Sequence, residues 1–401
     1  MLAIEHSGVS CYLKAQDTAF SYPFIQKEFN HLNFSTDSSS FLNFFNKLEQ
    51  LKQGKEQCIS IVHMGGSHVQ GGVWSNKFIS KWQTAFNSAG GGYFGFPYKI
   101  AKTNGQPYMT SFTSGNWKRC RAVGKEFCLP LGMSALSIIT NDSSNYFGVK
   151  TTKKATCRFF NRVKVFHNFN SNFDVAMVEN DSTFLAGEEH REFGYTLFRL
   201  DTLRDSVSFL LTRSDTLQKD FALYGFSVEN DQSPGFYLAA LGANGASSSS
   251  FLRCEFLLPQ LESLNADLFI LSLGVNDTQS KSFEKEDYIE NYDTLITYIK
   301  KSNPHAAIIL TTTTDNYIKR RTSNKRTITA REAMFELMEK HQVAVWDLFS
   351  LMGGYKSMPK WLKVGLASPD KVHFTNKGYE LLGDLMYEAV LKAYSNNIPK
   401  N

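Results

Sequence analysis

The chain has 401 residues, of which 42% are hydrophobic, and a formal net charge of +5 at neutral pH. This length exceeds what one hydrophobic core usually serves, so it favours two domains or an enzyme core with a large insertion. Basic residues are spread along the chain, and their one local cluster, at 319–321 and 325–326, is too small for a nucleic-acid-binding surface, so we expect no nucleic-acid partner.

The six cysteines form no Cys-x-x-Cys pair, and no histidine has zinc-finger spacing, so we expect neither a metal nor a cofactor. Cys120, Cys128 and Cys157 fall in one β-rich region and could include a disulfide, whose pairing the sequence leaves open. No stretch has the roughly 18–20 apolar residues of a membrane span, and the N-terminus lacks a signal-peptide pattern. We expect an exported protein of the periplasm or cell envelope whose signal peptide is not part of this sequence, with a cytoplasmic location as the alternative.

Residues 1–99 are expected to form the first part of an α/β core. Helices are predicted at 38–53 and 73–88, with a strand at 57–63 between them. The turn after this strand carries Gly65, Gly66 and Ser67. Glycines 90–92 follow a helix and lack the Lys-Ser/Thr ending of a phosphate loop, so we expect a flexible connector there.

Residues 100–234 show a different pattern. Short β-branched or aromatic runs are separated by Asn, Asp, Ser and Gly, and no convincing long helix interrupts them. This pattern predicts an antiparallel β-sandwich, carbohydrate-binding-like, inserted into the α/β core. Its Trp117 and Tyr146 could stack on sugar rings, although aromatic residues of a sandwich more often belong to the core.

Residues 235–401 return to alternating strands and helices. Strands are predicted at 236–241, 267–273, 306–312 and 343–346, and helices at 251–264, 288–301, 329–341 and 376–394. Such alternation implies a parallel sheet covered on both faces, with the site built by loops at the carboxyl ends of the strands.

Three short motifs, at 65–68, 274–277 and 370–373, lie where that rule would place a site, and their residues suit ester hydrolysis. Ser67 can act as nucleophile, His373 as the base that takes its proton, and Asp370, three residues earlier, as the carboxylate that orients His373. The oxyanion of the tetrahedral intermediate needs donors, for which the candidates are the backbone N–H groups of Ser67 and Gly242 and the side-chain amide of Asn276.

Each motif also has a purely structural interpretation. Ser67 could be the N-cap of the following helix, the sequence at 276–277 a simple turn, and His373 a solvated loop residue. The common order and context of the motifs favour the catalytic interpretation.

Three further polar residues are interpreted as supporting groups. We expect His63 to be a strand residue, His68 to be a loop residue or a substrate contact, and Asp315 to be a carboxylate at the end of a strand.

With these residues in view, the sequence resembles the SGNH, or GDSL-type, hydrolases, named for the Ser, Gly, Asn and His found here as Ser67, Gly242, Asn276 and His373. The resemblance covers the regions before and after the insertion. It implies a flavodoxin-like three-layer sandwich around a parallel sheet and a serine esterase without metal. The β insertion and the Gly-Ser-His-x-Gln pattern at 66–70 resemble those of bacterial peptidoglycan O-acetylesterases, which carry an inserted carbohydrate-binding-like module.

One departure from the family pattern is Gly66, which stands where the family usually has Asp. Glycine removes a side-chain hydrogen bond from the nucleophile turn, so we expect a lower rate. The sequence predicts a serine esterase that removes O-acetyl groups from peptidoglycan or another glycan, or from a small ester. The alternatives are a catalytically weakened glycan-binding envelope protein, and a lipase or acyltransferase that uses the same three residues.

Overall fold

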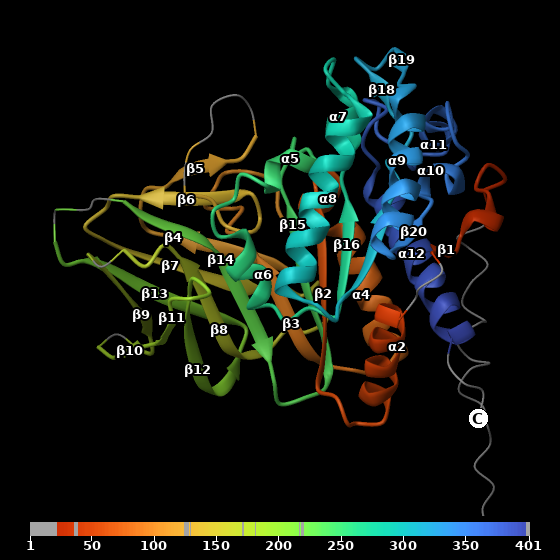
Figure 1. Ribbon diagram of the computed structural model, residues 1–401. Helices are drawn as coiled ribbons and strands as arrows, with labels where there is room; N and C mark the ends of the chain where they lie inside the picture. Colours follow the sequence, from red (N-terminus) through yellow and green to blue (C-terminus); the bar gives the residue numbers. More distant parts are fainter. Residues whose placement is uncertain are drawn as a thin grey trace, which may run out of the picture.

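The computed structural model describes residues 22–35, 39–123, 128, 130–170, 172–180, 182–215, 217 and 220–397. A 13-stranded mixed sheet runs through the molecule, with strand order β1-β20-β17-β16-β2-β15-β3-β14-β8-β12-β11 and with β6 and β5 attached through β14. Helices cover one half of this sheet, and a second sheet of five strands lies against the other half (Figure 1).

The half of the sheet covered by helices contains the strands that position the site. Its parallel strands are β2 (Cys58–Gly65), β3 (Gly90–Gly95), β15 (Gly235–Gly242), β16 (Leu268–Ser272), β17 (Ala307–Thr311) and β20 (Ala344–Trp346), with β1 (Leu32–Phe34) antiparallel at the edge. These parallel strands are buried along almost their whole length, as expected when helices cover both faces.

Helices form one layer on each face of this half. One layer has α2 (Ser39–Lys52), α4 (Val73–Ala85) and α12 (Asn376–Asn397), and the other has α6 (Leu257–Glu262), α8 (Lys285–Ser302) and α9 (Arg326–His341). Trp82 of α4 lies edge-on to Tyr387 of α12, with ring centroids 5.0 Å apart, and also contacts Phe236 of β15. Short helices at the ends of the layers are η1 (Lys27–Phe29), α3 (Ser67–Gln70), α5 (Ser248–Phe251), α7 (Val275–Gln279), α10 (Leu348–Leu351) and α11 (Met358–Lys363).

The helix predicted at 251–264 is wrong in its extent, because the structure has the two short helices α5 and α6 there. Ser247 and Ser250 form a capping box that starts α5. Pro259 lies in the first turn of α6, where a backbone N–H would have no partner within the helix. One continuous helix would place Pro259 in the interior, where this N–H is needed.

The inserted region divides between the two sheets. Its strands β5 (Lys118–Arg121), β6 (Leu136–Thr140), β8 (Phe160–His167), β11 (Glu188–His190), β12 (Tyr195–Arg204) and β14 (Phe221–Asn230) extend the large sheet. The second sheet consists of β4 (Met109–Thr113), β7 (Ser144–Thr151), β9 (Phe173–Val178), β10 (Phe184–Ala186) and β13 (Ser206–Arg213). Phe147 of β7 and Phe209 of β13 pack on Phe226 of β14, at 6.0 and 6.1 Å between centroids, so the two layers share a core.

The predicted fold class, an α/β core interrupted by a β-sandwich, is therefore confirmed. One layer of the sandwich continues the core sheet, because β14 pairs antiparallel with β3. The large sheet crosses both limits of the domain division 1–99, 100–234 and 235–401, and that division stays a prediction.

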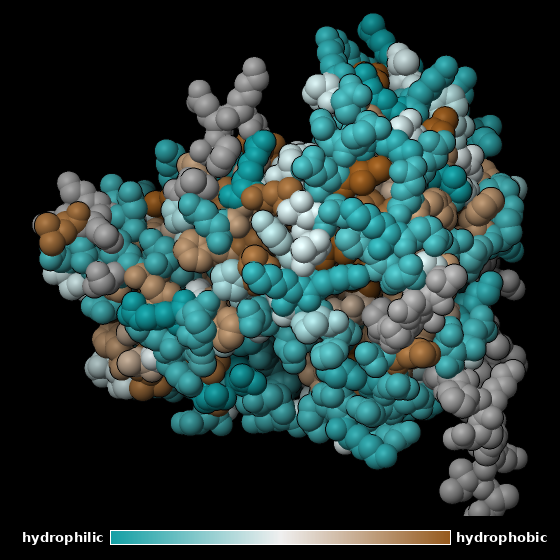
Figure 2. All heavy atoms as spheres, in the orientation of Figure 1, coloured by the Kyte–Doolittle hydropathy of each residue, from teal (hydrophilic) through white to brown (hydrophobic). Residues whose placement is uncertain are grey.

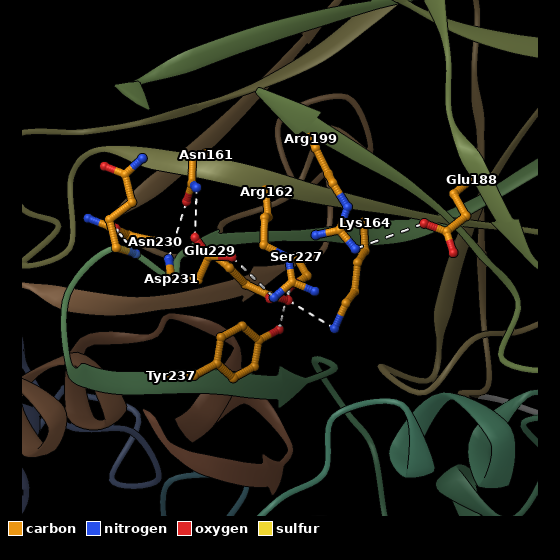
Figure 3. A network of polar contacts seen from close by, with 11 residues as sticks. Asn161, Arg162, Lys164, Glu188, Arg199, Ser227, Glu229, Asn230, Asp231 and Tyr237 are labelled. Carbon is orange, nitrogen blue, oxygen red and sulfur yellow. Dashed lines mark hydrogen bonds and ion pairs between the residues drawn. The ribbon is translucent and has the colours of Figure 1, made fainter. Parts of the chain in front are cut away.

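Polar side chains reinforce the junction between core and insertion (Figure 3). Tyr237 of β15 donates to Ser227 Oγ at 2.9 Å, Ser227 donates to Glu229, and Lys164 Nζ lies 3.0 Å from the same carboxylate. Burial alone would raise the pKa of Glu229, but Lys164 and Arg162 outweigh that effect and lower it. The carboxylate is therefore a charged link between β15, β14 and β8.

The cysteine pairing that the sequence left open is Cys120 with Cys128. Cys157 is buried and free. Of the two aromatic residues considered for sugar stacking, Tyr146 is exposed on β7, whereas Trp117 packs against Phe147 and donates its Nε1–H to Thr113. Within the described ranges, no helix is both long enough and apolar enough to cross a membrane.

The flexible connector expected at glycines 90–92 is wrong, because these residues begin the buried strand β3. Gly91 has φ +92°, and a Cβ there would lie 2.1 Å from the Phe236 carbonyl oxygen of β15. A Cβ on Gly90 would lie 1.7 Å from the Ser233 carbonyl oxygen. The glycines are therefore required by the close approach of two backbones, which periodicity alone does not reveal.

We expect Gly91→Ala to destabilise the protein by about 3 kcal/mol or more, because the methyl group collides with backbone at a strained φ. Gly54→Ala is the matched control, since Gly54 also has positive φ (+71°) but a Cβ there meets nothing within 4 Å. Its cost should be about 1 kcal/mol, from backbone strain alone. Chemical denaturation of both variants measures the difference, and equal losses would contradict this account.

Candidate active site

The three motifs meet at the carboxyl ends of neighbouring strands. Ser67 is the first residue of α3, directly after β2, and Asn276 lies in α7, directly after β16. Because β15 and β16 are the two neighbours of β2, the loops after all three strands lie side by side. The loop that carries Asp370 and His373 precedes α12, whose packing on α4 brings it to the same edge.

Ser67, His373 and Asp370 form a continuous chain of hydrogen bonds. Ser67 Oγ lies 2.7 Å from His373 Nε2, and His373 Nδ1 lies 2.8 Å from Asp370 Oδ2. The second carboxylate oxygen, Oδ1, accepts the backbone N–H groups of Val372 and His373, both at 2.9 Å. The side chains of His373 and Asp370 are partly exposed, so solvent and substrate can reach the site.

The carboxylate of Asp370 is held in its ionised form. Partial burial on its own would raise the pKa, but the hydrogen bonds from His373 and Val372 and the charge of His373 outweigh it, so the pKa of Asp370 is lowered. An ionised carboxylate on Nδ1 leaves Nε2 of His373 free to accept a proton from Ser67.

Candidate donors for an oxyanion come from the segments that follow β15 and β16. Asn276 Nδ2 donates to the Ala246 carbonyl at 2.9 Å, which leaves its second amide hydrogen available. Asp277, next to it, accepts the backbone N–H of Ser248 at 3.0 Å and its hydroxyl at 2.6 Å. This pair of contacts fixes the loop after β15 to α7.

Gly242 at the end of β15 and Gly245 in the loop that follows are the candidate backbone donors. Gly242 ends β15 in a buried position, where a Cβ would lie 2.2 Å from Gln70 N, so the close approach of α3 already requires glycine there. Gly245 was missed by sequence reasoning. It is exposed, has φ +84° and belongs to the loop that contacts Gly66. A glycine in the first turn after a parallel strand is the sequence feature that could have indicated it.

Gly66 lies against the Asn276 amide and the loop that follows β15. Its φ of −87° and ψ of −140° lie outside the main α and β regions. A Cβ there would lie 3.1 Å from Asn276 Nδ2 and 3.2 Å from the Ala246 carbonyl oxygen, which is tighter than ordinary van der Waals contact. The absence of a side chain lets the Asn276 amide lie close over the nucleophile turn.

Two buried histidines support the nucleophile turn. His63, in β2, bridges Ser75 Oγ of α4 and Ser272 Oγ of β16, each at 2.8 Å, which agrees with the expected strand position. His68 was expected in a loop or against substrate, but it is buried in α3, with Nδ1 2.9 Å from Tyr379 Oη and its ring 5.3 Å from that of His373. Burial lowers the pKa of each histidine to about 3, so both are neutral.

Asp315 holds together two segments near the site, one at Ser323 and one at Met358. It is fully buried and accepts the Met358 N–H at 2.9 Å and the Ser323 hydroxyl at 3.4 Å. The expected position after a strand is correct, but the carboxylate faces the protein interior. No group of three or more His, Cys, Asp or Glu side chains with the geometry of a metal site occurs among the residues described.

Comparisons with known proteins agree with this architecture. Residues 214–381 match the model of the GDSL-like Lipase/Acylhydrolase family. A solved structure of a peptidoglycan O-acetylesterase superposes with a TM-score of 0.73 at 18% identity, over 91% of this chain and 99% of that chain. The predicted resemblance to GDSL-type hydrolases is thus confirmed, and the likeness to the solved structure establishes the fold.

Other solved structures match smaller parts of the chain. A lipase/acylhydrolase from Enterococcus faecalis has a TM-score of 0.32 at 23% identity, covering 42% of this chain and 80% of that one. An acetyl xylan esterase has a TM-score of 0.32 at 21% identity, covering 39% of this chain and 81% of that one. A search of curated protein sequences finds no match to this chain.

We expect stability to fall between pH 7.5 and pH 5, partly because His63 stays neutral in the folded protein and becomes protonated on unfolding. Its folded pKa of about 3 lies below the unfolded value of 6.5, so the unfolded state binds more protons in this window. The group should account for about 2 kcal/mol at pH 5. Denaturation of His63→Gln at both pH values should show a dependence smaller by that amount.

The exposed His305 provides the control for that measurement. His305→Gln makes the same change of residue type at a surface position. An undiminished pH dependence in His63→Gln would show that His63 does not stay neutral in the folded state.

Proposed function

We propose that this protein is a serine esterase that removes O-acetyl groups from a carbohydrate polymer, such as peptidoglycan or another glycan. The observation that carries the proposal is the hydrogen-bonded chain from Ser67 through His373 to Asp370, at 2.7 and 2.8 Å, whose first bond joins residues 306 positions apart in sequence. A nucleophile, a base and an orienting carboxylate in this order are the arrangement of serine hydrolases.

In the acylation step, Ser67 Oγ attacks the acetyl carbonyl carbon while His373 Nε2 takes the hydroxyl proton. Asp370 stabilises the resulting imidazolium through Nδ1. The oxyanion accepts from the Ser67 N–H, the free amide hydrogen of Asn276 and the N–H of Gly242 or Gly245. Collapse breaks the bond to the sugar oxygen, which receives the proton from His373.

In the deacylation step, His373 takes a proton from water, and the hydroxide formed attacks the acetyl group on Ser67. The second tetrahedral intermediate uses the same donors. Its collapse releases acetate, and His373 returns the proton to Ser67 Oγ, which restores the enzyme.

Two features support an acetylated glycan as substrate and an envelope location. The solved structure that superposes on nearly the whole chain is a peptidoglycan O-acetylesterase, and that superposition includes the inserted β region. The Cys120–Cys128 disulfide suits an oxidising compartment outside the cytoplasm.

A second candidate is a glycan-binding envelope protein with weakened catalysis. Gly66 favours it, because the turn before Ser67 lacks the carboxylate that the family usually places there. The position of the Asn276 amide next to Gly66 favours the esterase, since it keeps this candidate donor close to the nucleophile.

We expect Ser67→Ala to lower acetate release from p-nitrophenyl acetate and from O-acetylated peptidoglycan about 10⁶-fold, because no other group can form the acetyl intermediate. Thermal unfolding of the variant should match the wild type. Turnover that survives in Ser67→Ala would rule out Ser67 as nucleophile. A wild type inert toward all esters that still co-sediments with peptidoglycan would support the binding protein.

We expect Asp370→Asn to lower kcat about 10⁴-fold and His373→Ala about 10⁶-fold, because some base function remains without the orienting carboxylate. Steady-state kinetics on p-nitrophenyl acetate measure both losses. A loss in Asp370→Asn equal to or greater than that in His373→Ala would argue against the orienting role.

A further inference from the structure

Two exposed basic elements lie on opposite sides of the candidate site. One is the hairpin of β18 (Tyr317–Ile318) and β19 (Thr322–Ser323), whose turn carries Lys319, Arg320 and Arg321. The other is β5 of the insertion, with Lys118, Arg119 and Arg121 exposed. Figure 1 shows both near the edge where the carboxyl ends of β15 and β16 lie, with α5 and α7 between them.

The hairpin is joined directly to the loop of the proposed base. Tyr317 N–H donates to the Lys371 carbonyl at 3.1 Å, two positions before His373, and Lys371 Nζ lies 5.0 Å from the Tyr317 ring. On the other side, Gln279 Nε2 donates to the Tyr317 carbonyl at 3.3 Å, three positions after Asn276. Through Tyr317, the hairpin thus connects the helix that carries Asn276 to the loop that carries His373.

The charged residues of this turn include two with strained backbone conformations. Lys319 has φ +49° and Arg320 φ +64°, a region that Gly and Asn occupy more easily. Lys371 also has positive φ, at +58°. Strained positions concentrate at functional sites, and here the strained residues are cationic. Figure 2 shows mostly hydrophilic residues at this end of the molecule, with a few hydrophobic ones among them.

The strand β5 ends at the other side of the site. The chain that leaves it reaches Val123, whose Cγ1 lies 3.1 Å from a Cβ built on Gly245. Arg253 donates to the Ala122 carbonyl at 3.2 Å and fixes this end next to α5. Charged residues are common on edge strands, where they prevent pairing with other chains. What distinguishes β5 is that it runs up to the loop of the candidate oxyanion donors.

The six cations have no carboxylate partner within the ranges that the structure describes. Of the acidic residues at this edge, Asp370 bonds His373 and Asp277 bonds Ser248, while Glu286 and Asp287 lie exposed in the first turn of α8, next to the loop of Asn276. The six cations themselves form no ion pair with these carboxylates and are therefore available to a ligand.

We propose that the two basic elements bind an anionic polymer, so that the substrate is an acetylated glycan that carries carboxylates and not a neutral one. The inference rests on the proposed esterase function. A chain lying across the site contacts the hairpin on one side and β5 on the other, with its acetyl group over Ser67. Opposite charge on both sides raises the rate of encounter, an effect that salt screens.

The test uses one variant of each element. Lys319→Asn, Arg320→Asn and Arg321→Gln together remove the hairpin charge and place Asn where φ is positive, so stability should not fall. Lys118→Gln, Arg119→Gln and Arg121→Gln remove the charge of β5. The matched control is Lys150→Gln, Lys153→Gln and Lys154→Gln, three exposed lysines at the end of β7 in the second sheet and the turn that follows.

Kinetics are measured on acetylated polygalacturonate, acetylated xylan and p-nitrophenyl acetate. At low ionic strength, the hairpin variant and the β5 variant should each lose about tenfold in kcat/KM on the polygalacturonate. Changes on xylan and p-nitrophenyl acetate should stay below twofold, and 0.5 M NaCl should bring wild type and variants together. The control variant should behave as the wild type.

Equal losses on xylan and polygalacturonate, or no loss on either, would overturn the proposal. Co-sedimentation of the full-length Ser67→Ala protein, with and without the hairpin substitutions, on insoluble peptidoglycan provides a readout without turnover. A wild type inert on every ester whose charge variants lose peptidoglycan binding would refute the esterase and keep the anionic ligand. An active wild type with unchanged variants would refute the anionic ligand alone.

Discussion

The packing of α12 on α4 is the contact on which the candidate site depends. Ser67 follows β2 near the N-terminus of the chain, whereas Asp370 and His373 precede α12 near its end. Trp82 of α4 contacts both Tyr387 of α12 and Phe236 of β15, so one buried aromatic group joins the two helices to the sheet. The 2.7 Å hydrogen bond between Ser67 and His373 is a local consequence of this long-range packing.

A second constraint is the continuity of the large sheet from the core into the insertion. The glycines of β3 allow it to approach β15 on one side, while β14 pairs with it on the other. The charged link through Glu229 adds side-chain contacts at the same junction. The inserted region is therefore joined to the core by a shared sheet, which holds β5 in a fixed place beside the loop of Gly245.

Buried polar groups hold the loops of the site in position. Asp277 fixes the loop after β15, Asp315 fixes the loop before α11, and His63 joins β2 to α4 and β16. Each pairs nearly all its polar atoms with loop backbone or hydroxyl groups, which offsets the free energy of removing it from water. The short helices α3 and α7 and the loop before α12 thereby hold Ser67, Asn276 and His373 in fixed positions.

Hydrophobic periodicity and local residue spacing were enough to predict the α/β alternation, the presence of a β insertion and the order of the three motifs, because they are properties of neighbouring residues. Asp370 and His373, three residues apart, could be paired from spacing alone. Only the tertiary structure decided that Ser67 reaches His373, that glycines 90–92 form a buried strand, that Gly245 joins Gly242 as a candidate donor and that His68 is buried. These outcomes depend on how backbones far apart in sequence approach one another, and no local pattern records that approach.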